Sequence, residues 1–491
     1  MKYLVYLLVL LTVIVCACKK DKIITDRGAK LGFSTDTILF DTVFVTFGST
    51  NSQLIVYNKN DQPINVSSIR LASGSSSYYR INVDGMPGAS FRDIEIAAND
   101  SLFIFIEVTI DPNSAQLPFV VADSILFETN GNLQDVDLVA WGQNARFIRA
   151  DQNIPGLPPI SVIPCNGNVA VWDSVLPYVI FGYAVVDSGC MLEIKEGTKV
   201  YLYNNSGLWV YRDATLKVMG TREHPVKFRG TRLESYYNDK PGQWDRIWIN
   251  EGSVNNEINY AEIKNGFIGL QLENLILNGI SDTSIAKKIV VNNTEIKNMS
   301  GANVFTRYYD ATFNNCVFGS TASYGCAITF GGTYEFNHCT FANYWSFGQR
   351  IDPLLYISNY FEDETKAVFD FELNKALFRN CIIYGNNESE VKIDIKSSAT
   401  SNYLFDHCIL KVKSDFDITN ATHFTNVFKN TEPQFKDPND GNFELDTMAN
   451  AKNKASNISC PALYPMLQFD RNGTDRCIYL PADLGAYERK D

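Results

Sequence analysis

A six-residue unit recurs between residues 258 and 410 and limits the fold more than any other feature of the sequence. Its copies read INYAEI, VNNTEI, FNNCVF, FNHCTF, FRNCII and FDHCIL, with fourth residues Ala261, Thr294, Cys316, Cys339, Cys381 and Cys408. These fourth residues follow one another at intervals of 22 to 42 positions. A period of about 20 to 50 residues is the signature of a solenoid, in which each repeat forms one coil. The sequence therefore predicts a stack of coils of about 22 residues each, with loops of varying length.

Alternation along a strand assigns the positions within the unit. The fourth residue and the residue two positions later point inward, because successive strand side chains face opposite sides. A buried free cysteine behaves as a small hydrophobe, so the four cysteines at this position are interpreted as core residues and not as metal ligands. The residues that precede the fourth position should stack at a turn, where side chains can bond along the ladder: Asn293, Asn315, His338, Asn380 and His407.

Two further stretches resemble a known fold. The run from Gly189 to Ile194 leads into EGTKV, LWVYRDATLKVMGT and PVKFRG, which resembles the opening coils of right-handed parallel β-helix proteins with the pectate-lyase-like fold. The end of the chain, DRNGTDR followed by PADLGAYE, is similar to the C-terminal segment of secreted β-helix proteins of the choice-of-anchor Q kind. The resemblance implies a right-handed parallel β-helix with a C-terminal cap over residues 165–491.

The same resemblance implies roles for charged residues and cysteines near the ends of the helix. A packed ion-pair network, without catalytic function, is expected in the cap from Asp470, Arg471, Arg476, Asp483 and Glu488. By analogy, the pairs Cys165–Cys190 and Cys460–Cys477 are the expected disulfides, and they would staple the open ends of the helix.

The N-terminal part has a different rhythm. Short alternating apolar runs such as TILFDTVFVTFG and SLFIFIEVTIDPN, separated by turn residues, extend over residues 31–148. This pattern predicts an immunoglobulin-like antiparallel β-sandwich, so the expected fold class is all-β. The segment resembles the N-terminal sandwich of many Bacteroidota surface lipoproteins, where it acts as a spacer. Residues 149–164 contain four prolines and no period, and we interpret them as a linker.

The start of the chain reads as an export signal. Lys2 precedes an uncharged apolar run from Tyr3 to Val15, which is shorter than the roughly 20 residues of a membrane span. The sequence VCAC then resembles the lipobox of bacterial lipoproteins. This resemblance implies a signal peptide over residues 1–17, lipidation of Cys18 and a tether over residues 18–30. By the family's sorting rule, Lys19 favours the outer membrane, and its periplasmic and cell-surface faces both stay open.

Charge and cysteine usage exclude several classes of partner. A formal net charge of -12 disfavours nucleic acid and anionic lipid headgroups, whereas a neutral glycan or a cation-dependent site fits it. Of the 11 cysteines, nine remain once Cys16 and Cys18 are set aside, so at least one thiol is free or pairs elsewhere. No zinc motif is present, and no cofactor is expected, with calcium as the one metal left open.

An enzymatic function is the alternative that the sequence leaves open. Pectate-lyase-like folds often hold calcium with stacked acids, and Glu262 with Glu295 are the candidates here because they occupy matching positions in neighbouring units. Later units carry apolar residues or threonine at that position, so an acidic stripe is not maintained. A glycosidase would need two carboxylates about 5 to 9.5 Å apart. The sequence does not single out such a pair.

The interruption after Phe341 supplies the candidate binding residues. This stretch is rich in aromatic and charged side chains, which suit sugar stacking or protein contact: Tyr344, Trp345, Arg350, Asp352, Tyr356 and Tyr360. The alternative is that these aromatics cover the side of the helix. Trp244 and Trp248 are expected in the core. The sequence as a whole favours a non-catalytic lipid-anchored protein whose β-helix binds a glycan or another outer-membrane protein, with a polysaccharide lyase or glycoside hydrolase as the alternative.

Overall fold

The computed structural model describes residues 22–111, 119–274, 288–478 and 480–489. The signal peptide and Cys18 lie outside these residues. The chain divides into two compact units near Asn144, and each is described by itself. None of the described helices is long and apolar enough to cross a membrane. The helical turns are η1 (Gly74–Ser76), η2 (Ser235–Tyr237), η3 (Pro438–Asp440) and η4 (Pro465–Gln468).

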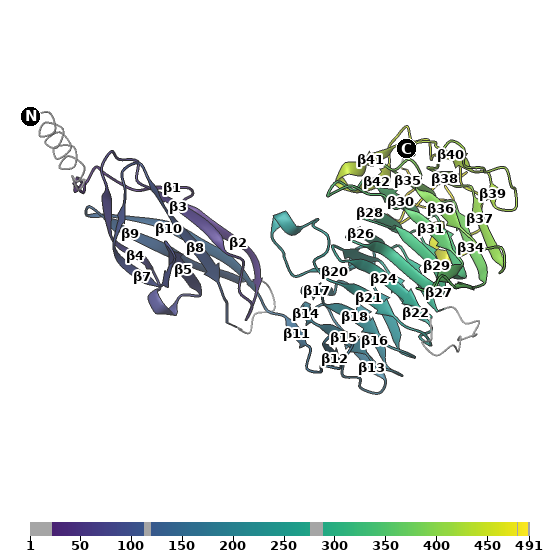
Figure 1. Cartoon of the computed structure of the whole chain (residues 1–491), viewed down its shortest axis with the longest axis horizontal. Helices are drawn as coiled ribbons and strands as arrows, with labels where there is room; N and C mark the ends of the chain where they lie inside the picture. The colour runs from purple at the N-terminus through teal and green to yellow at the C-terminus, as the bar shows by residue number, and fades with distance from the viewer. Residues whose placement is uncertain (1–21, 112–118, 275–287, 479, 490–491) are drawn as a thin grey trace, which may run out of the picture. The chain divides into compact units, whose positions relative to one another are not determined.

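The first unit is a β-sandwich of two five-stranded sheets (Figure 1). One sheet has the order β1 (Gly32–Phe33), β3 (Ser52–Tyr57), β8 (Ser101–Val108), β5 (Tyr79–Val83), β6 (Met86–Gly88). The other has the order β2 (Thr37–Phe44), β10 (Asn132–Gln143), β9 (Phe119–Thr129), β4 (Ile64–Leu71), β7 (Ser90–Ile96). Inward residues such as Leu54, Ile104 and Ile125 are fully buried, which is the alternation that the sequence predicts.

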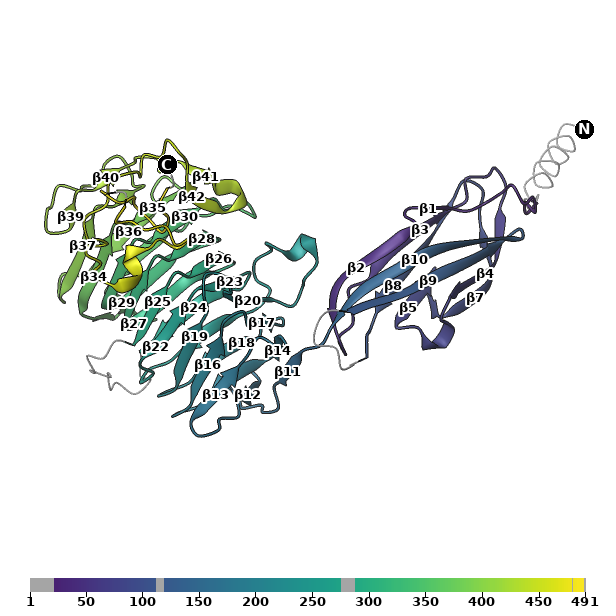
Figure 2. The same ribbon diagram turned by 180° about the vertical axis from the view of Figure 1, so that it is seen from behind.

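The second unit is a parallel β-helix with three stacks of strands (Figures 1 and 2). Stack A consists of β12 (Ile160–Val162), β15 (Tyr183–Val186), β18 (Gly207–Val210), β21 (Arg246–Ile249), β24 (Ile268–Glu273), β27 (Ala302–Asn314), β29 (Cys326–Asn337), β31 (Leu355–Ser358) and β36 (Val391–Asp394). Stack B consists of β13 (Val169–Trp172), β16 (Met191–Lys195), β19 (Thr215–Met219), β22 (Asn256–Asn259), β25 (Ile289–Asn292), the second halves of β27 and β29, β34 (Leu373–Arg379), β37 (Ser401–Asp406) and β39 (Phe424–Thr425).

Stack C is a separate eleven-stranded sheet. It consists of β11 (Arg146–Arg149), β14 (Tyr178–Phe181), β17 (Lys199–Leu202), β20 (Val226–Gly230), β23 (Ala261–Lys264), β26 (Glu295–Met299), β28 (Val317–Thr321), β30 (Thr340–Asn343), β35 (Ile382–Gly385), β38 (Ile409–Leu410) and β40 (Phe428–Lys429). Strand β11 pairs with β14, and β12 pairs with β15. The helix therefore starts upstream of residue 165, and strand β12 lies within the stretch interpreted as a linker.

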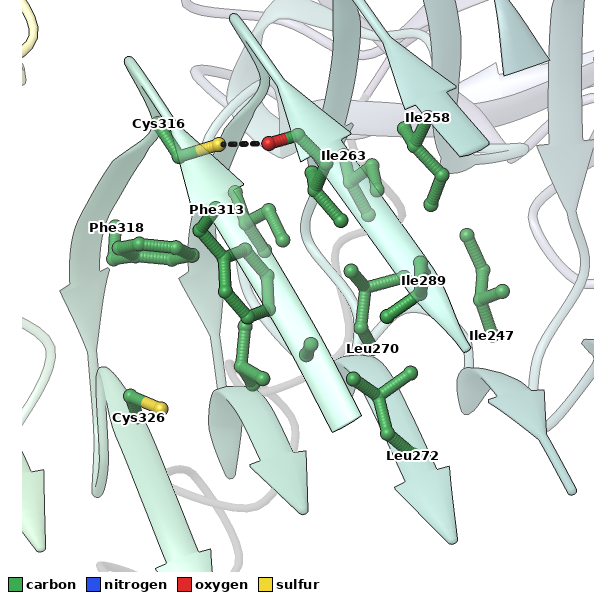
Figure 3. Packing of buried hydrophobic residues seen from close by; sticks show 14 of the residues in the cluster. Ile247, Ile258, Ile263, Leu270, Leu272, Ile289, Phe313, Cys316, Phe318 and Cys326 are labelled. Atoms are coloured by element: carbon green, nitrogen blue, oxygen red, sulfur yellow. Dashed lines mark hydrogen bonds between the residues drawn. The ribbon is translucent and has the colours of Figure 1, made fainter. Parts of the chain in front are cut away.

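The recurring unit forms the corner between stacks B and C. Its fourth residue is inside the helix: Cys316, Cys339, Cys381 and Cys408 are each fully buried. Figure 3 shows Cys316 among the packed apolar residues. The Cys316 thiol donates to the Val291 carbonyl of the preceding coil at 3.4 Å. Phenylalanines at the first position form a second internal ladder, in which Phe313, Phe336 and Phe378 stack with 4.8 Å between successive ring centroids. The interior is thus built from stacked like residues.

The third position of the unit takes the left-handed backbone conformation that turns the corner. Asn293, Asn315, His338, Asn380 and His407 all have φ between 49° and 56°. Asparagine tolerates this region better than other non-glycine residues. The Asn315 amide donates to the Asn293 side chain at 3.0 Å, and the Asn380 amide meets His338 Nε2 at 2.9 Å. The expected turn ladder is present.

The C-terminal segment runs back along the side of the helix rather than closing its end. Outward residues of stack C, such as Val317, Ile382 and Ile409, are fully buried against it. The segment supplies Phe443 and Leu484 to that cluster and includes β41 (Phe435–Asp437) and β42 (Asn442–Leu445). The segment expected to cap the end of the helix therefore covers its side, and we call residues 435–478 and 480–489 the lateral cover. In these coils apolar side chains point outward as well as inward, so the outer face of stack C must also be covered.

The cover contains the expected charged cluster. The Arg476 side chain is fully buried, lies 3.7 Å from Glu488 and donates to Asn315 Oδ1 at 2.9 Å. Asp470 accepts from the Glu488 amide at 2.7 Å, and Asp483 accepts from the Arg489 amide at 2.9 Å. Most partners of this cluster are backbone groups. Through Arg476 and Asn315 it links the C-terminal segment to the turn ladder of the coils.

Both cysteine pairs expected by analogy form disulfides. Cys165 and Cys190 join the first coils, with 6.2 Å between their Cα atoms. Cys460 and Cys477 are 5.5 Å apart at Cα and close a loop of the lateral cover, not an end of the helix. The remaining cysteines of the described residues are free and buried: Cys316, Cys326, Cys339, Cys381 and Cys408.

Candidate functional site

The six candidate binding residues between Tyr344 and Tyr360 do not form one site. Tyr344 packs on the lateral cover, with 6.3 Å between its ring centroid and that of Phe443. Burial raises the pKa of Tyr344, as expected for a phenol in an apolar contact. Trp345 contacts Phe347 in the following loop, with ring centroids 5.2 Å apart. Tyr344 therefore follows the alternative interpretation, in which the aromatic covers the helix.

Arg350 is a structural residue. Its guanidinium forms a two-pronged ion pair with Glu390, in which Nη1 lies 2.9 Å from Oε2 and Nη2 meets Oε1. The Arg350 side chain is 4% exposed and the Glu390 side chain is 0% exposed. Asp352 accepts from the Ser323 hydroxyl at 2.5 Å. The Arg350 charge is therefore not available to a ligand in this arrangement.

Tyr356 and Tyr360 are brought together by one carboxylate. Their hydroxyls donate to Asp394 at 3.1 and 3.2 Å. Lys392 lies over the Tyr356 ring at 5.4 Å, and Lys396 lies over the Tyr360 ring at 4.6 Å. Burial, together with Asp394, raises the pKa of Tyr356 to about 12. These two tyrosines lie at the surface and keep their hydroxyls protonated near neutral pH.

The outer face of stack A connects this pair to aromatic residues in earlier coils. Register pairing places one outward residue of each strand from β15 to β36 in a continuous row. The row contains Val185, Trp209, Trp248, Gln271, Phe305, Ala327, Tyr356 and Lys392. Strands in a sheet are about 4.8 Å apart, so side chains in such a row are direct neighbours. We call it the aromatic row.

The aromatic row is densest on β18 and β21. Trp209 and Trp248 stack with their ring centroids 4.9 Å apart and a 10° angle between planes. Tyr183 contacts Trp209 edge to face at 6.4 Å, and Tyr211 does so at 5.4 Å. Trp209 is 6% exposed, whereas Trp248 is half-buried and Tyr211 is 40% exposed. The inner ring is fixed by packing and the outer rings offer contact area.

Charged side chains lie directly beside the tryptophans. The Trp248 indole donates to Glu273 at 2.6 Å, and Arg307 on the next strand holds the same carboxylate at 2.7 Å. On the other side of the row, Arg246 pairs with Asp245 at 2.9 Å and also donates to Gln271. Burial and a hydrogen bond to Asp245 raise the pKa of Tyr183. These contacts fix the orientation of each polar head.

The arrangement combines flat rings with oriented donors and acceptors. An aromatic ring presents a large apolar surface at low entropic cost, and a carboxylate–guanidinium pair offers both acceptors and donors to a ligand hydroxyl. Tryptophan, tyrosine and arginine are the residues that most often dominate binding surfaces. The outer face of stack A can therefore bind a ligand that has flat apolar faces and many hydroxyl groups.

The two glutamates considered for calcium are adjacent but paired with cations. Glu262 and Glu295 are register partners on the outer side of stack C. Lys227 lies 3.2 Å from Glu262, and Lys297 lies 3.1 Å from Glu295. Burial opposes ionisation of Glu295, but Arg471 and Lys297 outweigh it and lower the pKa of this carboxyl. The described residues contain no cluster of three or more side chains of the metal-binding types.

The sequence interpretation missed the tryptophan pair on the outer face of stack A and the charged residues beside it. Trp244 is 1% exposed, as expected of a core residue, but Trp248 faces outward and the expectation for it was wrong. The signal was available in the alternation of RIWI, where Ile247 and Ile249 are fully buried and Trp248 lies between them. Trp209 occupies the same place in GLWV. Glu273 and Arg307 carried no recognisable motif.

Comparison with known proteins gives no family. No protein-family model and no curated protein matches the chain. Among solved structures, a family 123 glycoside hydrolase from Clostridium perfringens is 16% identical over 23% of this chain, with a TM-score of 0.18, and the match spans only 28% of that hydrolase. A protein of unknown function from Porphyromonas gingivalis W83 is 11% identical over 28% of this chain and 60% of its own, with a TM-score of 0.18.

Two solved structures, both of GH87 alpha-1,3-glucanases, match over most of the chain. The catalytic unit of a thermostable GH87 alpha-1,3-glucanase from Streptomyces thermodiastaticus is 11% identical over 77% of this chain and 78% of its own, with a TM-score of 0.24. At such identities and scores, similarity assigns neither a substrate nor a reaction. The chain is an all-β protein with a β-sandwich followed by a parallel β-helix.

Proposed function

We propose that this protein is a lipid-anchored envelope protein that binds a glycan along the outer face of stack A, without cleaving it. The observation that carries the proposal is the stacked pair Trp209–Trp248 with Glu273 and Arg307 beside it. Pyranose rings have apolar faces that stack on indoles and hydroxyls that bond to carboxylates and guanidinium groups. The row crosses successive coils, which suits a polymer more than a single sugar.

The charge of the surface supports a neutral ligand at this site. Glu273 is paired with Arg307 and Asp245 is paired with Arg246, so acidic and basic heads balance each other along the tryptophans. A strongly charged ligand would have to break one of these pairs. A neutral glycan can bond to both members of each pair without displacing either.

A polysaccharide hydrolase is the second candidate, because Asp245 and Glu273 place two carboxylates on one face. Both are already hydrogen-bonded within the protein, Asp245 to Tyr183 and Glu273 to Trp248. Incubation of the chain starting at Lys19 with a panel of glucans, mannans and xylans, followed by size-exclusion chromatography, separates the candidates. Binding with unchanged polymer length supports the proposal. Shortening that is lost in Glu273→Gln would establish the hydrolase instead.

The lipid anchor is tested separately. The sequence VCAC, which ends at Cys18 and is followed at once by the polar run KKDK, supports lipidation of this cysteine. Several acyl chains on one residue give stable membrane attachment. Metabolic labelling with a palmitate analogue should mark the wild type and not Cys18→Ala. Protease treatment of whole cells then distinguishes the two faces of the outer membrane, because only a surface-exposed chain is digested.

A further inference from the structure

The outer side of stack C carries a line of three cations on neighbouring strands. Lys264 on β23 is the register partner of Lys297 on β26. Arg229 on β20 follows Phe228, whose register partner is Ile263, so Arg229 lies beside Lys264. Neighbouring strands are about 4.8 Å apart, which brings three like charges into one row. The row is notable in a chain whose net charge is -12.

The three cations are only partly compensated. Among the described residues Arg229 takes part in no ion pair, its Nη2 donates to the Arg232 carbonyl at 3.4 Å, and its buried Nε has no hydrogen-bond partner. Lys297 is 3.1 Å from Glu295, but that carboxylate also serves Arg471 at 3.7 Å. Lys264 lies 3.6 Å from the Asp239 carboxylate and also interacts with Glu262, which pairs with Lys227 at 3.2 Å. Positive charge therefore exceeds negative charge along the row.

Lys264 shows the consequence. Burial lowers the pKa of its ammonium group, and the positive charges of Arg229 and Lys297 lower it further, against the opposite effects of Asp239 and Glu262. A row of this kind is unfavourable by itself, because like charges destabilise one another. An added anion would relieve the repulsion at all three positions.

The protein's own Asp239 shows that a carboxylate fits here. Its Oδ1 accepts from the Asn298 amide at 3.1 Å while lying 3.6 Å from the Lys264 ammonium. The Asp239 side chain is 55% exposed and belongs to the loop that joins β20 to β21, outside the strands that carry the row. A lysine and an amide donor already form half of an anion site, and the remaining cations extend it along the stack.

We propose that Arg229, Lys264 and Lys297 bind successive carboxylate or sulfate groups of an acidic glycan. A linear acidic polysaccharide repeats its charges along the chain, and the row repeats its cations along the coils. This site is distinct from the aromatic row, which lies on stack A and has balanced charges. The protein would then bind two kinds of glycan, or one glycan with neutral and acidic segments, on two sides of the helix.

The test uses the soluble chain starting at Lys19 with polygalacturonate, dextran sulfate and neutral dextran as probes, and with phosphatidylglycerol vesicles and single-stranded DNA as competing polyanions. The variant Lys264→Met/Lys297→Met keeps the aliphatic stems and removes two charges. Its matched control is Lys195→Met/Lys217→Met, which removes two ion-paired lysines from the outer side of stack B. Thermal unfolding of both variants confirms that they are folded.

We expect wild-type binding to polygalacturonate or dextran sulfate, a loss of roughly tenfold in the stack C variant, and little change in the control. Binding should weaken at about 0.5 M salt because exposed charges are screened. Absence of binding, or equal losses in both variants, would overturn the proposal. So would a preference for phosphatidylglycerol vesicles or single-stranded DNA over both polymers. If Trp248→Ala removes polyanion binding and the stack C variant does not, the acidic glycan belongs to the aromatic row, and the function proposed above stands without this second site.

Discussion

Trp209 and Trp248 stack almost parallel on neighbouring coils, with 4.9 Å between their ring centroids. Trp209 is 6% exposed and its indole donates to Asn250, whereas Trp248 is half-buried and donates to Glu273. One ring is part of a small outer core with Ile160, and the other covers it from the solvent side. The two residues should therefore differ in what their loss removes.

Truncation of the two tryptophans should separate stability from binding. Trp209→Ala should lower the free energy of unfolding by about 3 kcal/mol, as expected for a buried aromatic residue. Trp248→Ala should lower it by about 1 kcal/mol, the range of an aromatic pair contact. Urea denaturation followed by circular dichroism measures both. Equal losses would show that the two rings are equally buried in solution.

Asn315 should be sensitive to both its side chain and its backbone. Its side-chain amide donates to Asn293, its side-chain oxygen Oδ1 accepts from the buried Arg476, and its φ is 53°. Asn315→Ala should lower the free energy of unfolding by about 3 kcal/mol, because it removes the side-chain hydrogen bonds to Asn293, Arg476 and Met466 and strains the corner. Asn315→Gly should be about 1 kcal/mol less harmful, since glycine relieves the backbone term.

The matched control for Asn315 is Asn205. It has a φ of 56° in an exposed turn and no side-chain hydrogen bond within the described part of the chain. Asn205→Ala should lower the free energy of unfolding by about 1 kcal/mol, the cost of placing alanine in the left-handed conformation. A loss as large as that of Asn315→Ala would mean that the ladder contributes nothing.

Removing one member of the buried pair Arg350–Glu390 should lower stability strongly, whereas replacing both members should lower it less. Arg350→Met leaves a fully buried carboxylate without its cation, and about 3 to 5 kcal/mol of stability should be lost. The double variant Arg350→Met/Glu390→Gln should recover part of that loss, because no uncompensated charge remains. Thermal unfolding of the three proteins measures the difference. Equal stability of the single and double variants would contradict a buried ion pair.

Glu488 should make stability depend on pH. Burial and the nearby Asp483 raise the pKa of Glu488 to about 8 from 4.5. Between these values the folded protein holds a proton that the unfolded chain releases, so the contribution to stability is full below pH 4.5 and is lost as the pH rises through 8. Burial also raises the pKa of Asp470, which acts in the same direction.

Glu488→Gln removes the titration while keeping an oxygen that accepts from the Asp483 amide. The wild type should lose more stability between pH 5 and pH 8.5 than the variant does, in urea denaturation at the two pH values. A wild type that becomes more stable relative to Glu488→Gln over this interval would show that the carboxyl is ionised in the folded state.

The coils could be predicted from sequence because their signals are local. The unit around Cys316 alternates over six residues, and the turn residue before it is asparagine, which tolerates the required backbone conformation. Side-chain alternation alone therefore placed Cys339, Cys381 and Cys408 in the core. The same rule applied to RIWI would have placed Trp248 outside.

The functional surface could not be predicted because its residues meet through stacking of the coils. Glu273 and Arg307 are 34 positions apart and become neighbours only through the register of β24 with β27. The pairing of Arg350 with Glu390 spans 40 positions and turns an apparent ligand-binding arginine into a structural one. The lateral cover depends on apolar residues facing outward, which a sequence pattern does not distinguish from an exposed aliphatic residue.

The aromatic row is tested most directly by affinity electrophoresis of the soluble chain in gels that contain glucans, mannans or xylans. Trp248→Ala and Tyr356→Ala are compared with the wild type and with Phe103→Ala, which removes an exposed ring from the β-sandwich. We expect at least one polymer to retard the wild type and Phe103→Ala equally, and to retard the Trp248 and Tyr356 variants less. Retardation that is unchanged in Trp248→Ala would contradict a glycan site on the outer face of stack A.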